Sequence, residues 1–164
     1  MTAAVLILLA MVAVIAALNP GREGFAWFMA LRRPAWLTFE RLIPAVWAAI
    51  YACFYASALL SWNAVPARGP AMAAYLVLLV LVQSYTWLIC RTRSLRNGTV
   101  VGFAGWVWGV ALAVAMAPHS RPAWLLLVPF LLWSPVGTFI TWRMEGLNRN
   151  PGRGAQAGAS GTKR

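Results

Sequence analysis

Five long apolar segments, broken by short polar stretches, divide this 164-residue chain and constrain its fold more than any other feature. The expected membrane spans are 2–18, 42–62, 71–90, 99–117 and 123–142. A helix rises about 1.5 Å per residue, so about 20 apolar residues cross the hydrocarbon core of a bilayer. Five such helices predict an all-α membrane protein, a five-transmembrane-helix bundle formed by residues 1–147. Residues 148–164 are rich in Gly, Ala, Ser and basic residues and are expected to form a disordered tail.

The composition excludes a soluble globular domain. The chain is 62% hydrophobic and 10% charged, whereas a soluble domain carries about 25% charged residues. The first segment is expected to be a retained helix, because no Lys or Arg precedes Arg22 and no small-residue cleavage site follows. Cys53 and Cys90 lie inside apolar stretches without metal-binding spacing, which argues against a metal site or a disulfide framework.

The basic residues predict the orientation of the bundle. If five spans alternate in direction, only Arg68 and Arg121 fall on one side. The other side receives Arg22, Arg32, Arg33, Arg41, Arg91, Arg93, Arg96, Arg143, Arg149, Arg153, Lys163 and Arg164. By the positive-inside rule, the C-terminus and the first connection face the cytoplasm and the N-terminus lies outside. Anionic lipid headgroups account for the net charge of +11. No nucleic-acid partner is expected, because the chain lacks a soluble basic module.

Few side chains within the spans can perform chemistry. No Asp, Glu, Lys or Arg lies near the middle of any expected span, which argues against an ion-coupled pump. No paired carboxylates are present to act as acid and base in hydrolysis. Glu23, Glu40 and Glu145 fall at the expected cytoplasmic face, where pairing with neighbouring arginines is the simplest role. His119 is expected to be a surface residue, with a role as a haem-iron ligand as the alternative. No cofactor is expected to be required.

The aromatic residues are the stronger functional signal, since ten tryptophans occur in the chain. Trp47 and Tyr51 are four residues apart and share one helix face. Other tryptophans lie deep in the expected spans, namely Trp87, Trp106, Trp108 and Trp133. Each of these indoles could instead pack against lipid or a neighbouring helix. Together they indicate a cavity suited to a flat, apolar, polycyclic ligand.

Two further features bear on such a cavity. The connection 19–41 is aromatic, so it is expected either to rest at headgroup level or to form a lid over the open end of the bundle. Pro44, Pro129 and Pro135 are expected to remove helix hydrogen bonds, open space and free carbonyls as acceptors. Small residues that permit close helix contact are Gly102, Gly105, Gly109 and Gly137.

Several motifs resemble those of the TspO/MBR family, the translocator proteins or tryptophan-rich sensory proteins. Arg33-Pro34-Ala35-Trp36 is similar to the family's Lys-Pro-x-Trp. Pro44 to Tyr51 is similar to its Pro-x-x-Trp-x-x-x-Tyr. Trp124 to Trp133 is similar to its Trp-Leu-Leu-x-Pro-Tyr-x-x-Trp, with Phe130 in place of the tyrosine. The resemblance covers residues 1–150.

The resemblance implies a five-helix bundle, often a homodimer, that binds porphyrins and sterol-like or synthetic aromatic ligands beneath the first connection. The ligand is thus expected to be a porphyrin or haem-type tetrapyrrole, which the protein moves, senses or sequesters. Carried over by position, the expected ligand-binding residues are Trp36, Trp47, Tyr51, Ser84, Trp87 and Trp133, with Gln83 as an alternative to Ser84. Two other functions stay open. One is porphyrin breakdown using a pocket tryptophan, and the other is a structural, partner-binding bundle.

Overall fold

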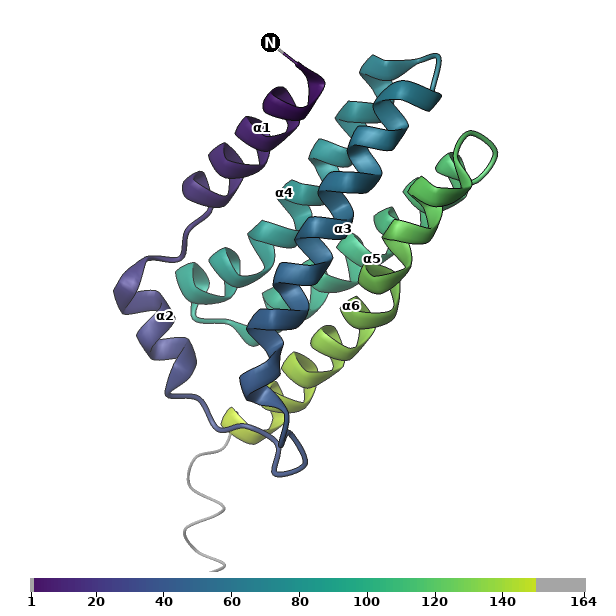
Figure 1. Ribbon diagram of the computed structural model, residues 1–164. Helices are drawn as coiled ribbons and strands as arrows, with labels where there is room; N and C mark the ends of the chain where they lie inside the picture. Colours follow the sequence, from purple (N-terminus) through teal and green to yellow (C-terminus); the bar gives the residue numbers. More distant parts are fainter. Residues whose placement is uncertain (1, 150–164) are drawn as a thin grey trace, which may run out of the picture.

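The computed structural model of the chain describes residues 2–149, which form six α-helices and one short 3-10 helix and contain no strand (Figure 1). The helices are α1 (Ala3–Ala17), α2 (Gly21–Met29), η1 (Glu40–Leu42), α3 (Ile43–Ala64), α4 (Arg68–Thr92), α5 (Leu95–Met116) and α6 (Arg121–Asn148). This architecture confirms the expected all-α membrane bundle. The predicted tail lies outside the described residues except for Asn148, the last residue of α6, and Arg149.

Four of the helices are long and apolar enough to cross a membrane by themselves: α3 with η1, α4, α5 and α6. The fifth expected span differs. Helix α1 has 15 residues and is therefore about 22 Å long, which is shorter than the hydrocarbon core. A fifth span results if α1 and α2 are counted together, and these two helices are bent by 74° relative to each other. The chain is therefore an integral membrane protein with four candidate spans, or five if α1 and α2 are counted as one broken span.

The break lies at Asn19-Pro20-Gly21. Pro20 has no N–H to continue α1. Gly21 adopts a φ of +73°, a left-handed conformation that glycine tolerates best. The Asn19 side chain accepts a hydrogen bond from the Gly21 N–H at 3.0 Å. The connection 19–41 is thus not a loop throughout, because its first half forms α2.

Helices α3, α4, α5 and α6 surround the main core, while α1 packs on α3 and α4. In Figure 1 these four helices run side by side, with α1 beside α4 and α3. Met11 is the buried side chain of α1. The core itself includes Ile50, Phe54, Leu78, Leu112 and Leu127. Apolar side chains from all four long helices therefore meet in one cluster.

A polar network ties α3, α4 and α6 together inside that core. The Tyr75 hydroxyl lies 2.6 Å from the Ser57 hydroxyl and 2.9 Å from the Ser61 hydroxyl. Ser57 also donates to the backbone carbonyl of Ala123 at 2.8 Å. All of these groups are buried, and hydrogen bonding removes the penalty of placing them in an apolar interior.

The three prolines behave differently from one another. Pro44 lies in the first turn of α3, where no helical donor is lost, so the expected kink at this residue is wrong. Pro129 and Pro135 lie inside α6. Pro135 cannot donate to the Leu131 carbonyl four residues earlier, and the Trp106 indole N–H of α5 donates to that carbonyl instead, at 3.1 Å. The expected release of a carbonyl as an acceptor is therefore confirmed at Leu131.

Glycines let α5 approach its neighbours. A Cβ atom on Gly109 would lie 2.5 Å from the Phe130 ring of α6, and one on Gly102 would lie 2.6 Å from the Thr138 hydroxyl. The expected close contact therefore occurs at both positions. Gly137 differs, since a Cβ there would meet nothing within 4 Å.

Candidate functional site

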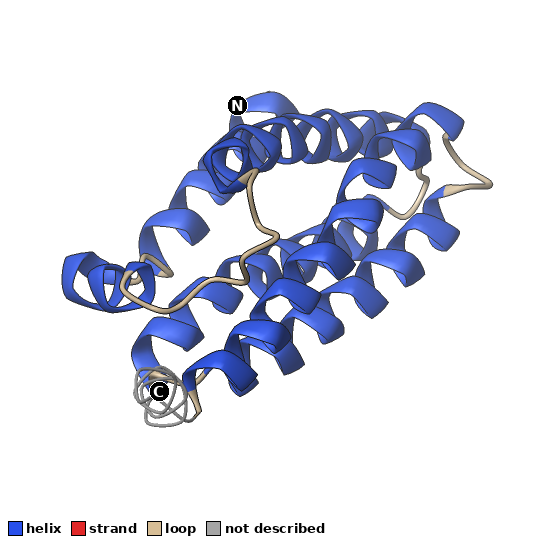
Figure 2. Cartoon of the chain, turned by 90° about the horizontal axis from the view of Figure 1, so that it is seen from below, coloured by secondary structure: helices blue, strands red, loops and turns tan. Residues whose placement is uncertain are grey.

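One end of the bundle holds a cavity of about 340 Å³ beneath α2 and the linker, defined here as residues 30–39. Viewed from that end, the linker runs across the opening of the bundle (Figure 2). The lining is mostly apolar and includes side chains of Phe25, Phe28, Met29, Leu37, Ile43, Trp47, Leu81, Val82, Tyr85, Phe130, Trp133, Ile140 and Met144. A mostly apolar, partly open cavity of this kind is typical of small-molecule sites.

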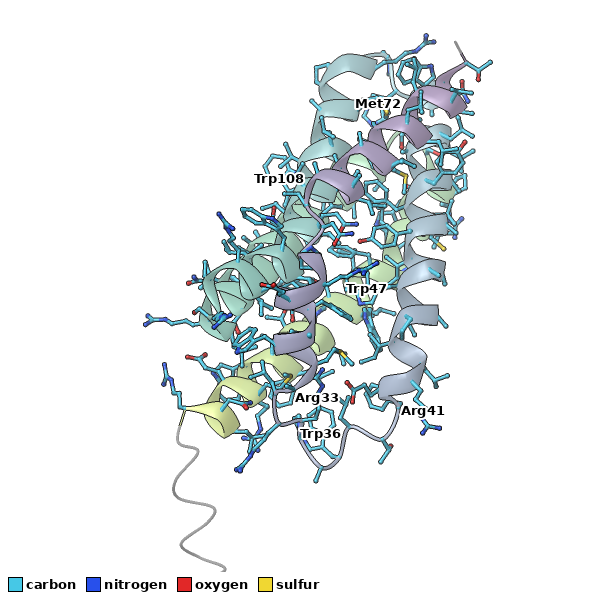
Figure 3. The ribbon with its side chains drawn as sticks, turned by 90° about the vertical axis from the view of Figure 1, so that its left-hand side faces the viewer. Arg33, Trp36, Arg41, Trp47, Met72 and Trp108 are labelled. Carbon is cyan, nitrogen blue, oxygen red and sulfur yellow. The ribbon has the colours of Figure 1, made fainter. Side chains whose placement is uncertain are left out.

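Two tryptophans, one from α3 and one from α6, form part of the lining. Trp47 comes from the second turn of α3, and its ring centroid lies 6.0 Å from that of Tyr51. Figure 3 shows Trp47 pointing from α3 into the molecule. Trp133 comes from the middle of α6, and the ring of Phe39 packs edge-on against it at 6.3 Å. Each indole is thus held by a second aromatic ring, which fixes its orientation for stacking on a ligand.

The indole N–H of Trp133 is buried and has no hydrogen-bond partner among residues 2–149. A buried donor left unsatisfied costs about 1–3 kcal/mol. Trp133 lines the cavity, but its buried indole nitrogen has no surface open to that cavity. The unsatisfied N–H therefore lies on the packed side of the ring.

Tyr85 forms part of the cavity wall between α4 and α6. Its hydroxyl is hydrogen-bonded to the Thr141 hydroxyl and donates to the Gly137 carbonyl at 3.3 Å. A Cβ atom on Gly102 would come within 3.1 Å of the Tyr85 ring. Glycine at that position therefore makes room for the ring, and the hydroxyl bonds hold it against α6.

Helix α2 closes the side of the cavity. Phe25, Phe28 and Met29 line it, and their spacing of three and four residues places them on one helix face. On the neighbouring face, a Cβ on Gly24 would lie 2.9 Å from the Cys90 side chain, so glycine allows α2 to sit directly on α4. Phe25 and Met29 remain about half exposed. Helix α2 thus lines the cavity and also exposes apolar surface, so its expected roles as a lid and as a segment at headgroup level are compatible.

The linker is held at two places. Leu37 is buried in a second apolar cluster with Ile89, Leu95, Ile140 and Met144. The side chain of Asn148 accepts from the Arg32 N–H at 3.0 Å and donates to the Arg32 carbonyl at 3.1 Å. The side chain of the last α6 residue therefore satisfies both backbone hydrogen-bonding groups of Arg32 in the linker. Together, α2, the linker and η1 form a lid over the cavity.

Two charged side chains of the lid face the cavity, Arg33 and Glu40. Arg33 Nε donates to Glu40 Oε1 at 2.7 Å. Within residues 2–149 no other charged side chain lines the cavity, and no group of three or more His, Cys, Asp and Glu side chains is placed to bind a metal. Glu145 pairs with Arg149 at 2.6 Å. The expected pairing of glutamates with neighbouring arginines is thus confirmed for Glu40 and Glu145.

The structure brings Trp47 and Trp133 together in the cavity but not the other four expected residues. Trp36 lies at the outer turn of the linker, 44% exposed and 6.1 Å from the Phe139 ring (Figure 3). Tyr51 lies one turn beyond Trp47 and accepts a hydrogen bond from the Gln83 amide at 2.7 Å. The Tyr51 ring packs against the Trp47 ring outside the cavity lining. Whether these residues contact a ligand remains a prediction.

On α4 the expected positions are offset from the cavity. The α4 residues that line it are Leu81, Val82, Tyr85 and Thr86. Ser84 and Trp87 fall on other faces of that helix, because each residue turns the helix by about 100°. Gln83, weighed as an alternative to Ser84, contacts Tyr51 instead. Apolar residues surround nearly the whole of α4, so no pattern in the sequence marks its inward face.

Trp106 and Trp108 take structural positions instead. Trp106 donates to Leu131, as described above, and Trp108 donates to the Ala74 carbonyl at 2.9 Å. Trp108 lies on the outer side of the bundle (Figure 3). Of the five tryptophans that indicated a cavity, only Trp47 and Trp133 line it within residues 2–149, and phenyl and phenol rings complete the lining.

Comparison with known proteins identifies the family to which this bundle belongs. The sequence model of the TspO/MBR family matches residues 3–147. The chain belongs to the TspO/MBR family. It is 28% identical over 129 residues to the translocator protein of Bos taurus, which covers 74% of this chain and 75% of that protein.

Two bacterial relatives cover similar parts of the chain. The tryptophan-rich protein TspO of Bacillus cereus is 23% identical over 124 residues, which cover 74% of this chain and 80% of that protein. The uncharacterized membrane protein YtaB of Bacillus subtilis is 24% identical over 124 residues with the same coverage. None of these names denotes a catalytic activity. The family relationship supports a ligand-binding, transport or sensing role in the membrane.

Proposed function

We propose that this TspO/MBR protein binds flat, apolar, polycyclic ligands of the porphyrin class in the cavity under the lid, and moves, senses or sequesters them. The observation that carries the proposal is the presence of two indoles, Trp47 and Trp133, in the lining of a mostly apolar, lidded cavity. Stacking on two indoles favours a planar ring system.

The proposed orientation places the cavity at the cytoplasmic side. The linker, the α4–α5 turn and the end of α6 lie at one end of the bundle, opposite the start of α1 (Figure 1). These segments carry most of the basic residues, and the opposite end carries Arg68 and Arg121. The positive-inside rule then directs the lid toward the cytoplasm. Ligand exchange through the lid would therefore connect the cavity with the cytoplasmic leaflet or the cytosol.

The experiment is a titration of detergent-purified protein with protoporphyrin, followed by the porphyrin's absorbance. Trp47→Phe and Trp133→Phe are each expected to weaken binding about two- to tenfold, because an aromatic contact contributes about 0.5–1.5 kcal/mol. Trp124→Phe is the matched control. Trp124 lies in the first turn of α6, away from the end of that helix that lines the cavity, and is not itself a lining residue. Saturable binding weakened in both cavity variants but not in the control supports the proposal.

Two results would count against it. Non-saturable absorbance changes, equal in all four proteins, would show that porphyrin merely partitions into the micelle. Equal weakening in Trp124→Phe would show that any loss of indole perturbs the fold. A loss of porphyrin absorbance with time, abolished in Trp133→Phe, would instead support porphyrin breakdown.

A further inference from the structure

The guanidinium of Arg33 is held in place by contacts on several sides. Nη1 donates to the Phe28 carbonyl at 3.2 Å, and the guanidinium carbon lies 4.9 Å from the centroid of the Phe28 ring. Nη1 also lies 3.8 Å from the Met144 sulfur, and Nη2 lies 3.5 Å from the Met29 sulfur. The side chain is 17% exposed. Arg33 is therefore a fixed, mostly buried cation at the cavity edge.

The donors of Arg33 are only partly matched by strong acceptors. Glu40 takes Nε, but the two thioether sulfurs are weak acceptors. A guanidinium pairs best with a carboxylate through two parallel bonds. Nη2, which has no closer acceptor than the Met29 sulfur, would gain most from a second carboxylate oxygen. Any ligand carboxylate entering the cavity would therefore be drawn to Arg33.

Glu40 already holds that position. Its carboxylate faces the same cavity and neutralises the cation. Its side chain is 39% exposed, and it belongs to the three-residue helix η1 at the end of the linker. Glu40 can therefore turn to solvent once its bond to Arg33 is broken, whereas Arg33, with its several contacts, stays.

We propose that Glu40 acts as a built-in substitute for a ligand carboxylate on Arg33, and so sets the preference of the cavity between uncharged and carboxylated ligands. This inference rests on the proposed function. A neutral polycycle enters with the Arg33–Glu40 pair intact. A carboxylated one displaces Glu40, and its affinity is lowered by the free energy of breaking that pair. Glu40 is thus a specificity-determining residue rather than a catalytic one.

The test compares protoporphyrin, which carries two carboxylates, with its uncharged dimethyl ester. Glu40→Gln is expected to tighten binding of the acid about three- to tenfold relative to the ester, because a charged hydrogen bond contributes about 1.5–3 kcal/mol before screening by solvent. Adding Arg33→Gln to Glu40→Gln is expected to abolish the gain. The matched control is Glu145→Gln, which removes the same charge from an ion pair away from the cavity lining.

The ratio of the two affinities distinguishes the outcomes. A gain for the acid in Glu40→Gln but not in Glu145→Gln supports the inference. Two results would overturn the inference and leave the proposed function standing. In the first, both porphyrins bind saturably and the ratio of their affinities is unchanged in Glu40→Gln. In the second, Glu145→Gln shows the same gain for the acid as Glu40→Gln. Absence of saturable binding of the ester as well as the acid overturns the proposed function and the inference together.

Discussion

Replacing Trp106 by phenylalanine is expected to leave a backbone carbonyl of α6 without a donor. The Leu131 carbonyl cannot be satisfied within its helix, because the residue four positions later is Pro135. The Trp106 indole supplies the missing donor at 3.1 Å. Phenylalanine keeps most of the aromatic surface, including the contact with Phe103 at 6.1 Å, but has no N–H.

Two known ranges bound the loss of unfolding free energy expected for Trp106→Phe. An unsatisfied buried polar group costs about 1–3 kcal/mol, whereas interhelical hydrogen bonds in membrane proteins average about 0.6 kcal/mol and reach about 1.7 kcal/mol. We therefore expect the lost bond itself to lower the free energy of unfolding by about 1 kcal/mol. Smaller packing changes from the indole add to this, so the single variant alone does not isolate the bond.

A double-mutant cycle isolates it. Pro135→Ala restores a helical N–H to Leu131, so Trp106→Phe should cost about 1 kcal/mol less in that background than in the wild type. The assay is the free energy of unfolding in mixed micelles of a mild detergent and SDS. Pro129→Ala is the matched control, because Pro129 frees the Leu125 carbonyl instead, and its cycle with Trp106→Phe should be additive. Additive free energies in the Pro135 cycle would refute the assignment of Trp106 as the replacement donor.

Three further predictions concern packing and the lid. Gly109→Ala should destabilise the bundle by about 1–3 kcal/mol, because the added Cβ would lie 2.5 Å from the Phe130 ring of α6. Gly137→Ala is the control and should be nearly neutral, since its Cβ would meet nothing within 4 Å. Equal thermal stabilities of the two variants would contradict this prediction. Tyr75→Phe should lower the free energy of unfolding by about 1 kcal/mol by removing the hydroxyl that links two buried serines, and an unchanged value would show that the serines find other partners. Asn148→Ala should speed porphyrin dissociation in stopped-flow measurements several-fold with little change in stability, because it releases both hydrogen bonds to the Arg32 backbone; an unchanged rate would mean that the lid does not limit exchange.

The local sequence was sufficient to predict the five longest apolar helices, and its basic residues give an orientation that stays a prediction. Span positions follow from runs of apolar residues, and the two ends follow from basic residues near those runs. The family motifs also pointed to Trp47 and Trp133, which line the cavity. Helix α2 was missed, although Phe25, Phe28 and Met29 carry a helical spacing, because a nine-residue helix gives too short a signal to separate it from a loop.

Only the tertiary structure decided which faces turn inward. Nothing in the sequence distinguishes Tyr85, which lines the cavity, from Trp87 two residues later, which does not. The sequence also does not show that Arg33 and Glu40, seven residues apart, would form an ion pair at the cavity edge. In a soluble protein, hydropathy marks the inward face of each helix. In a membrane the lipid is as apolar as the core, so helix rotation is set by close packing at glycines such as Gly102 and by interhelical hydrogen bonds such as that of Trp106.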